Sequence, residues 1–451
     1  MFPRLNLARA AFAVGLLIAA SQPVAAAVFD PKTFTLPNGL EVVVIENHRL
    51  PVVTQMVWYK VGSADDPQGQ SGVAHFLEHL MFRGSGSIAP GEFSRIVARN
   101  GGRDNAFTSW DYTAYHQTVA ADRLELVMKL ESDRMANLAI TEEVVTPERQ
   151  VIIEERRSRT DNNPAALLNE QMNASLFLNH PYRIPVIGWQ HEMATLTQAG
   201  ALDFYRRHYA PNNAILIVSG DVTVEQVRGL AAKYYAPIPR RDIAPRTRLR
   251  EPLHVAARRV VLESDRVREP RLTREYLAPS YTTGDTQYAY ALQVLETILS
   301  GGATSRLHKK LVEDDKLAVS AYASYEPSAL DYGTLSIGGQ PRSDVPLSKL
   351  EEAIDLEIAR LLKDGVTADE VTRAKNQLVS SSDYARDSLR RGAMAIGTAL
   401  ATGQTVADVE SWPERIGAVT PEQVNAAARN VFNIVNSVTG ALLPAPRPSR
   451  S

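Results

Sequence analysis

His75-Phe-Leu-Glu78-His79, within the stretch Gly72-Val-Ala-His-Phe-Leu-Glu-His-Leu-Met-Phe82, is the most informative segment of this 451-residue chain. Its apolar residues recur at the spacing of one helix face, so the stretch predicts a helix. At 3.6 residues per turn, His75 and His79 project about 40° apart, and Glu78 lies about 60° to the other side of His75. Both imidazoles can therefore reach one ion while the carboxylate faces the same point.

This arrangement favours a zinc site. Zinc in hydrolytic enzymes is bound by neutral imidazoles and a carboxylate, and its fourth position is left for water. A nearby carboxylate such as Glu78 can accept a proton from that water as it attacks a carbonyl. The alternative interpretation is two surface histidines on an ordinary helix.

A second helical pattern, at residues 142–160, supplies carboxylates that fit the same site. Glu148 and Glu155 are seven positions apart, so they lie nearly in line on one helix face. One of them can act as a third ligand, and the other can accept a hydrogen bond from a ligating histidine. Acidic residues on a helix are otherwise usually a solvated surface.

Outward from the motif, strand and helix patterns alternate in two comparable series. The first series has a hairpin at 35–45 that turns at Asn38-Gly39, strands at 52–61 and 214–219, and one long alternating strand at 105–119; its helices are expected at 72–82, 91–99, 122–137, 142–160 and 224–235. The second has strands at 259–263, 271–277, 317–325 and 333–339, and helices at 287–299, 305–312, 347–363 and 368–401. The predicted fold class is α+β, with two homologous tandem domains, each a mostly antiparallel sheet packed against helices.

The domain boundaries follow from composition. Residues 1–27 have Arg4 and Arg9 before a short apolar run and end in Ala25-Ala26-Ala27, which is typical of a signal peptide cleaved after Ala27. The run is too short for a membrane span, which would be the alternative. Residues 28–240 form the predicted domain with the histidine motif, the Pro- and Arg-rich residues 241–252 a linker, and residues 253–451 the second domain, which lacks the motif.

Composition limits the compartment and the partners. The chain has no cysteine, so any transition-metal site must use histidine and carboxylate ligands. Export without disulfides favours a bacterial periplasm, with secretion as the alternative. Removal of Arg4 and Arg9 with the signal peptide reduces the 49 basic residues to 47, against 51 acidic residues. No basic cluster indicates binding to nucleic acid. No membrane span is expected in the mature chain.

The surrounding sequence resembles the pitrilysin and mitochondrial processing peptidase family of zinc peptidases, which share the inverted H-x-x-E-H motif. The stretch from Gly72 to Gly84 resembles the core motif of that family, and residues 105–115 resemble its substrate-binding edge strand. Residues 148–155 resemble its distal glutamate segment, and residues 209–222 resemble the close of its first domain. The resemblance covers nearly the whole mature chain, more strongly before residue 240.

The resemblance implies a zinc-dependent endopeptidase with one zinc ion per chain, in which the two tandem domains form half of a clamshell. Its ligand spacing places the third zinc ligand at Glu155 and the auxiliary glutamate at Glu148. Glu154 is the rival by composition, but it points about 100° away from Glu155 on a regular helix. The edge-strand match implies that extended or unfolded peptide substrates pair with Asn105, Ala106, Phe107 and Thr108.

One departure from the family pattern bears on the partner. The segment around Ser305-Arg306-Leu307 resembles the corresponding segment of family members that are active alone or as homodimers. In those members an arginine and a tyrosine that bind substrate follow it, and the matching positions in this chain are Val312 and Val319. Tyr322 is near, but an offset of three residues points it to the opposite face of a strand. We therefore expect this chain to be the catalytic half of a heterodimer whose family-related partner supplies the Arg/Tyr pair. The alternative is a non-catalytic scaffold or assembly subunit.

Overall fold

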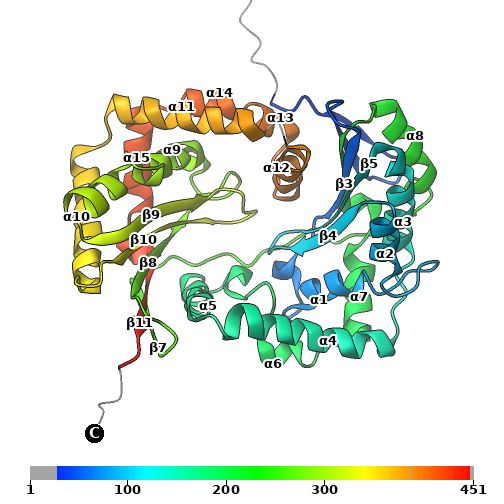
Figure 1. The fold of residues 1–451 in the computed structure, drawn as a ribbon, viewed down its shortest axis with the longest axis horizontal. Helices are drawn as coiled ribbons and strands as arrows, with labels where there is room; N and C mark the ends of the chain where they lie inside the picture. Colours follow the sequence, from blue (N-terminus) through cyan, green and yellow to red (C-terminus); the bar gives the residue numbers. More distant parts are fainter. Residues whose placement is uncertain (1–27, 386–387, 447–451) are drawn as a thin grey trace, which may run out of the picture.

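Two β-sheets, each with its own layer of helices, make up the part of the chain that the computed structural model describes, residues 28–385 and 388–446 (Figure 1). The predicted signal peptide, residues 1–27, lies outside the described residues. Within the described ranges, no helix combines the length and apolar character needed to cross a membrane.

The first sheet has six strands in the order β1-β2-β6-β3-β5-β4. Only the β2–β6 pair is parallel. The strands are β1 (Lys32–Thr35), β2 (Glu41–Glu46), β3 (Val52–Tyr59), β4 (Arg103–Thr108), β5 (Thr113–Ala120) and β6 (Ala214–Gly220). The predicted hairpin turn at Asn38-Gly39 is confirmed, since β1 pairs antiparallel with β2 and Gly39 has a φ of 91°.

Strands β2, β3 and β6 are buried along most of their length because both faces of the sheet are covered. One face packs against α1 (Val73–Leu80), α3 (Leu124–Ala136), α7 (Gln198–His208) and α8 (Val224–Tyr234). The other face packs against α12 (Leu389–Ala401). The remaining helices of this half are α2 (Glu92–Arg99), α4 (Glu142–Arg156), α5 (Pro164–Leu176) and α6 (Gln190–Met193).

The prediction of one long strand at 105–119 is wrong. The segment is the hairpin of β4 and β5, in which Thr108 pairs with Thr113 and the Ser109 amide donates to the Tyr112 carbonyl at 2.8 Å. The alternation of side chains continues on both sides of this short turn, so the sequence pattern hides it. The hairpin leaves β4 at the edge of the sheet.

The second sheet has the order β7-β11-β8-β10-β9. Its strands are β7 (Arg258–Ser264), β8 (Arg271–Ala278), β9 (Ala318–Glu326), β10 (Gly333–Pro341) and β11 (Ser437–Pro444). Each strand of the second sheet has a counterpart in the first sheet with the same chain order, neighbours and direction, and only β1 of the first sheet has none. The parallel pair β7–β11 corresponds to β2–β6. This shared topology confirms the predicted duplication, and it makes β9 the counterpart of β4.

The two halves exchange one helix each. Helix α5 leaves the first half and packs on β7 and β11 of the second sheet, where Leu168 and Met172 contact Val438 and Leu442. Helix α12 leaves the second half and packs on the first sheet, between the two sheets in Figure 1. Helix α12 packs mainly on β6 and β3, and α5 packs mainly on β11 and β7, so each helix covers only part of its sheet.

The remaining helices of the second half are α9 (Ala289–Ser300), α10 (Leu347–Asp364), α11 (Ala368–Ala385), α13 (Val406–Glu410), α14 (Trp412–Gly417) and α15 (Pro421–Val431). The predicted single helix at 368–401 is wrong, because α12 begins separately with Ser388 as its N-cap. A helix at 305–312 is only partly correct, since residues 308–314 form a wider π-helical turn.

Candidate metal centre

Helix α1 presents His75, Glu78 and His79 from a firmly fixed start. The Asp66 carboxylate accepts hydrogen bonds from the backbone amides of Gly72 at 2.7 Å and Ala74 at 3.0 Å, which satisfies free donors at the helix N-terminus. Gly72 has a φ of 88°, and a Cβ there would lie 2.5 Å from the Ile187 carbonyl oxygen. The apolar face of the helix, including Phe76 and Leu77, is fully buried. This packing leaves the histidine face turned towards α4.

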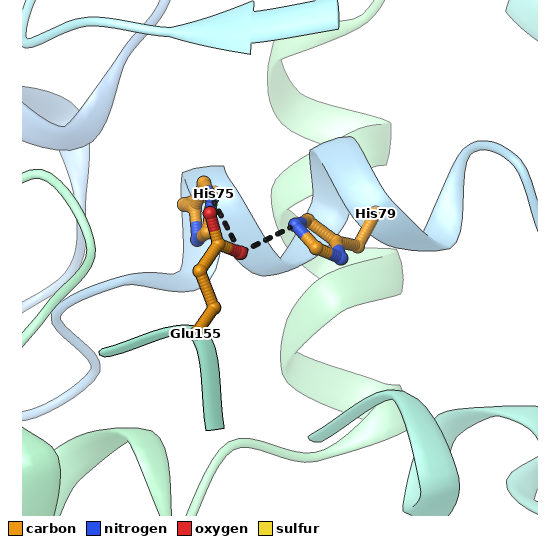
Figure 2. A group of neighbouring side chains, drawn as sticks. All are labelled: His75, His79 and Glu155. Atoms are coloured by element: carbon orange, nitrogen blue, oxygen red, sulfur yellow. Dashed lines mark ion pairs between the residues drawn. The ribbon is translucent and has the colours of Figure 1, made fainter. Parts of the chain in front are cut away.

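Glu155 reaches both histidines from α4 (Figure 2). Its Oε2 lies 3.2 Å from His79 Nε2 and 3.8 Å from His75 Nε2. One possible ligand atom from each of the three residues lies within 4.8 Å of the others, and this is the one such group of three or more found among the described residues. Glu155 also forms an ion pair with Arg159, four residues later.

Glu148 lies behind this cluster and orients His79. One carboxylate oxygen is 2.8 Å from His79 Nδ1, and the other accepts a hydrogen bond from Arg83 Nε at 2.5 Å. When a metal is bound, a proton on Nδ1 held by Glu148 would leave the Nε2 lone pair of His79 free to ligate the ion. This is the carboxylate–histidine pairing that commonly supports a zinc ligand.

Glu78 is connected to the edge strand. Thr108, the last residue of β4, donates a hydrogen bond from Oγ1 to Glu78 Oε2 at 2.5 Å. Burial raises the pKa of the Glu78 carboxyl, and the Thr108 hydrogen bond opposes this rise. A buried carboxylate with a raised pKa is suited to accept a proton near neutral pH.

The two histidines differ in their electrostatics. Burial, followed by the charge of His79, lowers the pKa of His75 to about 4, so this imidazole is neutral. Burial also acts to lower the pKa of His79, but the hydrogen bonds with Glu148 and Glu155 outweigh it and raise the pKa to about 9. The hydrogen bond with His79 lowers the pKa of Glu155. Burial acts to raise the pKa of Glu148, but the hydrogen bonds with His79 and Arg83 outweigh burial, so this pKa is also lowered. The cluster therefore has carboxylates ready to bind a cation.

The cluster fits a zinc ion. Ligand atoms at zinc–nitrogen and zinc–oxygen distances in a tetrahedron are roughly 3.3 Å apart. The separations of 3.2 and 3.8 Å between Glu155 and the histidines are close to this value. Two imidazoles and one carboxylate are also the donor set of catalytic zinc sites.

The rejected rival Glu154 and the predicted substrate-binding residues lie outside the cluster. Glu154 is 62% exposed and forms an ion pair with Arg157, so it points away from the histidines. Asn105 is exposed on β4, and its Oδ1 accepts a hydrogen bond from the Ala106 amide. Phe107 packs edge-on against Trp58, with ring centroids 5.3 Å apart.

The two valines that replace the expected Arg/Tyr pair lie in the second half. Val312 is half-buried in the π-helical turn, and Val319 is 59% exposed on β9. Tyr322 lies three residues further along β9, and its hydroxyl is 2.8 Å from Thr273 Oγ1. The pairing of β9 with β10 skips Val319 in a bulge, so the simple alternation expected between Val319 and Tyr322 does not hold. Neither valine can donate a hydrogen bond from its side chain.

Sequence reasoning missed three residues that support the site: Asp66 at the start of α1, Arg83 on Glu148 and Arg159 on Glu155. Two of them carried a usable signal. Arg83 follows His79 by four residues and Arg159 follows Glu155 by four, the spacing at which helical side chains are neighbours. Asp66 lies in an irregular segment, where no periodic pattern marks it.

An α+β fold with an H-x-x-E-H helix and a distal glutamate facing it defines a zinc metallopeptidase. Residues 41–189 match the family model described as Insulinase (Peptidase family M16), and residues 195–378 match the model described as Peptidase M16 inactive domain. The chain is 33% identical to the zinc protease PqqE of Helicobacter pylori over 367 residues, which cover 78% of this chain and 81% of that protein. The chain therefore belongs to peptidase family M16.

Solved structures agree with this assignment. A protease from Helicobacter pylori has a TM-score of 0.86 and 28% identity, covering 92% of this chain and 99% of that one. The periplasmic protease PqqL from Escherichia coli has a TM-score of 0.80 and 20% identity, covering 92% of this chain but only 48% of PqqL. The fold of this chain thus corresponds to one half of that longer protein. The family models divide the chain near residue 190, so our boundary at 240 and linker at 241–252 stay a proposal.

Proposed function

We propose that this chain is the catalytic subunit of a zinc endopeptidase that hydrolyses extended or unfolded peptides. The observation that carries the proposal is the convergence of His75, His79 and Glu155, with Glu78 beside them on the same helix. Such a set has the ligands, the base and the nearby edge strand that peptide hydrolysis requires.

His75, His79 and Glu155 would hold one zinc ion, and Glu148 would fix the tautomer of His79. Zinc bound there would act as a Lewis acid, lowering the pKa of a water towards neutrality and polarising the peptide carbonyl. Glu154 is not assigned a role, since it faces solvent and pairs with Arg157.

Glu78 would accept a proton from the attacking water and pass it to the leaving amine. Its carboxylate is positioned by Thr108 Oγ1 at 2.5 Å, so the base is tied to the strand that would hold the substrate. Burial raises the pKa of Glu78 from its ordinary value, which favours both halves of this proton transfer.

Peptides would bind by pairing with the free edge of β4. This strand pairs with β5 on one side, and within the described residues no strand lies on its other side. An added strand would receive main-chain hydrogen bonds from the segment Asn105–Thr108, and its scissile bond would lie near Glu78. An unfolded or extended substrate satisfies this requirement, whereas a folded one does not.

The chain would work with a family-related partner. Val312 and Val319 stand where self-sufficient relatives are expected to have an arginine and a tyrosine, and the chain matches only half of PqqL. We propose a heterodimer in which the partner contributes that pair and closes the clamshell. The signal-peptide pattern of residues 1–27 supports export to the periplasm, with secretion as the alternative.

The test combines metal analysis with peptide hydrolysis. Glu78→Gln should abolish hydrolysis, by on the order of 10²–10⁴-fold, while zinc stays bound. Assays of the chain alone and with a sister chain that carries the Arg/Tyr pair but lacks the zinc motif should show activity only, or mainly, in the mixture. Full activity of the isolated chain would contradict the heterodimer, and a chain without stoichiometric zinc would favour a scaffold role.

A further inference from the structure

A cavity of about 460 Å³ lies between the two halves, next to the end of β4. Its first wall is the β4–β5 turn, including Trp110 and Tyr112, which directly follows Thr108. Its second wall is formed by β8, β9 and β10 and includes Glu275 and Glu326. Because Thr108 holds Glu78, the cavity begins within a few residues of the proposed catalytic base.

The second wall is a polar sheet face that α5 leaves open. Glu275, which lines the cavity, belongs to a cross-strand row with Ser336 and Ser324, and Glu326 lies two residues from Ser324 on the same sheet face. On the neighbouring strand β11, Val438 pairs with Glu275 and is buried under α5, and the partly buried Leu277, two residues along β8, packs against the same apolar cluster. The change from apolar to polar residues therefore coincides with the edge of the covering helix.

Both carboxylates face the cavity without a cation. Glu275 is half-buried and accepts a hydrogen bond from Ser336 Oγ at 3.2 Å, and Glu326 accepts one from the Ser328 amide at 2.8 Å. Within the described residues, burial and the Ser336 hydrogen bond are the influences on the pKa of Glu275, and no Lys, Arg or His is among them. Glu275 is partly removed from water without a cationic partner, which is unfavourable, whereas Glu326 is exposed at the end of β9. A cationic group that entered the cavity would be stabilised by the first carboxylate and attracted by the second. Burial also raises the pKa of the Glu275 carboxyl, as expected for an acid without a cation.

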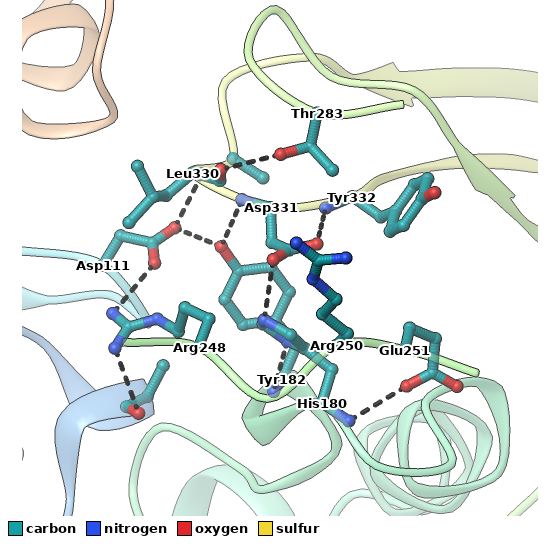
Figure 3. A network of polar contacts seen from close by, with 12 residues as sticks. Asp111, His180, Tyr182, Arg248, Arg250, Glu251, Thr283, Leu330, Asp331 and Tyr332 are labelled. Atoms are coloured by element: carbon teal, nitrogen blue, oxygen red, sulfur yellow. Dashed lines mark hydrogen bonds and ion pairs between the residues drawn. The ribbon is translucent and has the colours of Figure 1, made fainter. Parts of the chain in front are cut away.

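The cavity is held in shape by polar contacts between the halves (Figure 3). Asp111, in the β4–β5 turn, accepts hydrogen bonds from Tyr182 Oη at 2.5 Å and from the Leu330 amide at 3.0 Å. Arg248 contacts the other oxygen of Asp111 at 3.4 Å. These contacts fasten the β4–β5 turn to the β9–β10 turn, so the two walls keep a fixed separation without a ligand.

We propose that this cavity is a specificity subsite that binds a basic side chain, lysine or arginine, of the peptide substrate through Glu275 and Glu326. The proposal rests on the proposed function, because it places the peptide along β4. An extended chain advances about 3.3 Å per residue, so the residue that enters the cavity is roughly two to four positions from the one opposite Thr108. Aromatic walls such as Trp110 and Tyr112 would contact the aliphatic part of that side chain.

The test measures peptide binding to the zinc-loaded, full mature chain carrying Glu78→Gln, alone and with its partner chain. Fluorescent neutral peptides with one lysine moved through the sequence are compared with the same peptides carrying norleucine, by anisotropy. We expect lysine at one position to tighten binding roughly tenfold. Glu275→Gln and Glu326→Gln should each reduce this ratio, and Glu326→Lys should instead favour glutamate at that position. Glu263→Gln, an exposed change on β7, should leave the ratio unchanged.

The outcomes separate the two proposals. Peptides that bind equally well with lysine and norleucine at every position would overturn the subsite and leave the peptidase proposal standing. A lysine preference that survives both glutamine substitutions would also overturn it. Absence of binding by any peptide, in both preparations, would count against the proposed function itself. Melting temperatures of each variant show whether the fold is kept. If Glu275→Gln is unstable, Glu326→Lys, at the exposed end of β9, still tests the subsite.

Discussion

Replacing Glu148 by glutamine removes the charge that orients His79 while keeping the size of the side chain. The Glu148 carboxylate accepts from His79 Nδ1 at 2.8 Å and from Arg83 Nε at 2.5 Å, and its side chain is only 4% exposed. A glutamine has one acceptor oxygen and one amide group that only donates. If the oxygen accepts from His79, the amide faces the Arg83 donor, so one of the two contacts must be lost.

A hydrogen bond to a charged group contributes about 1.5–3 kcal/mol, and supports behind a ligating histidine typically change metal affinity by about 10–100-fold. We therefore expect Glu148→Gln to weaken zinc binding by about 10–100-fold, measured by competition with a chromogenic chelator. Glu154→Gln makes the same chemical change on an exposed residue of the same helix, so it should leave zinc affinity unchanged. A zinc affinity for Glu148→Gln that is unchanged within about threefold, in a variant with normal melting, would refute this account of His79.

Three further predictions concern the surroundings of the site. Thr108→Val should leave zinc binding intact but lower kcat by about tenfold or more, because Glu78 loses its hydrogen bond; steady-state kinetics and metal analysis check it. Gly72→Ala should destabilise the fold by about 2 kcal/mol or more in urea unfolding, since the residue has a φ of 88° and its Cβ would lie 2.5 Å from the Ile187 carbonyl oxygen. Burial raises the pKa of Glu296 to about 7 from 4.5, so the folded protein binds the extra proton and its stability falls as pH rises through this window. Glu296→Gln should therefore stabilise the protein at pH 8 by about 1–2 kcal/mol after allowance for solvent screening, and should give no gain at pH 4.5; thermal melts at both pH values test this.

The local chemistry of the site could be predicted from sequence because it depends on helical geometry. Spacing alone placed His75 and His79 on one side of α1, and it placed Glu148 and Glu155 on one face of α4. Glu148 and Glu155 are the two carboxylates that the structure brings to His79. The resemblance to a known family then selected Glu155 over Glu154, and the structure points Glu154 to solvent.

Long-range features could not be predicted in this way. The exchange of α5 and α12 between the halves depends on tertiary packing, since an amphipathic helix does not specify which sheet it will cover. The β4–β5 turn was missed because Trp110-Asp111 is not an Asn-Gly or Asp-Gly pair, the usual mark of a tight hairpin, and alternation continues around it. The contacts of Asp111 with Tyr182 and Leu330, which explain its place in that turn, join residues far apart in the sequence.

Zinc content of the purified chain tests the central claim most directly. After dialysis, wild type and Glu154→Gln should each retain about one zinc per chain, because three ligands remain in both. Glu155→Gln should lose most of its zinc under the same conditions, since the ligand facing both histidines has been changed. Zinc lost from Glu154→Gln but kept by Glu155→Gln, or no zinc in the wild-type chain, would contradict the proposed metal centre.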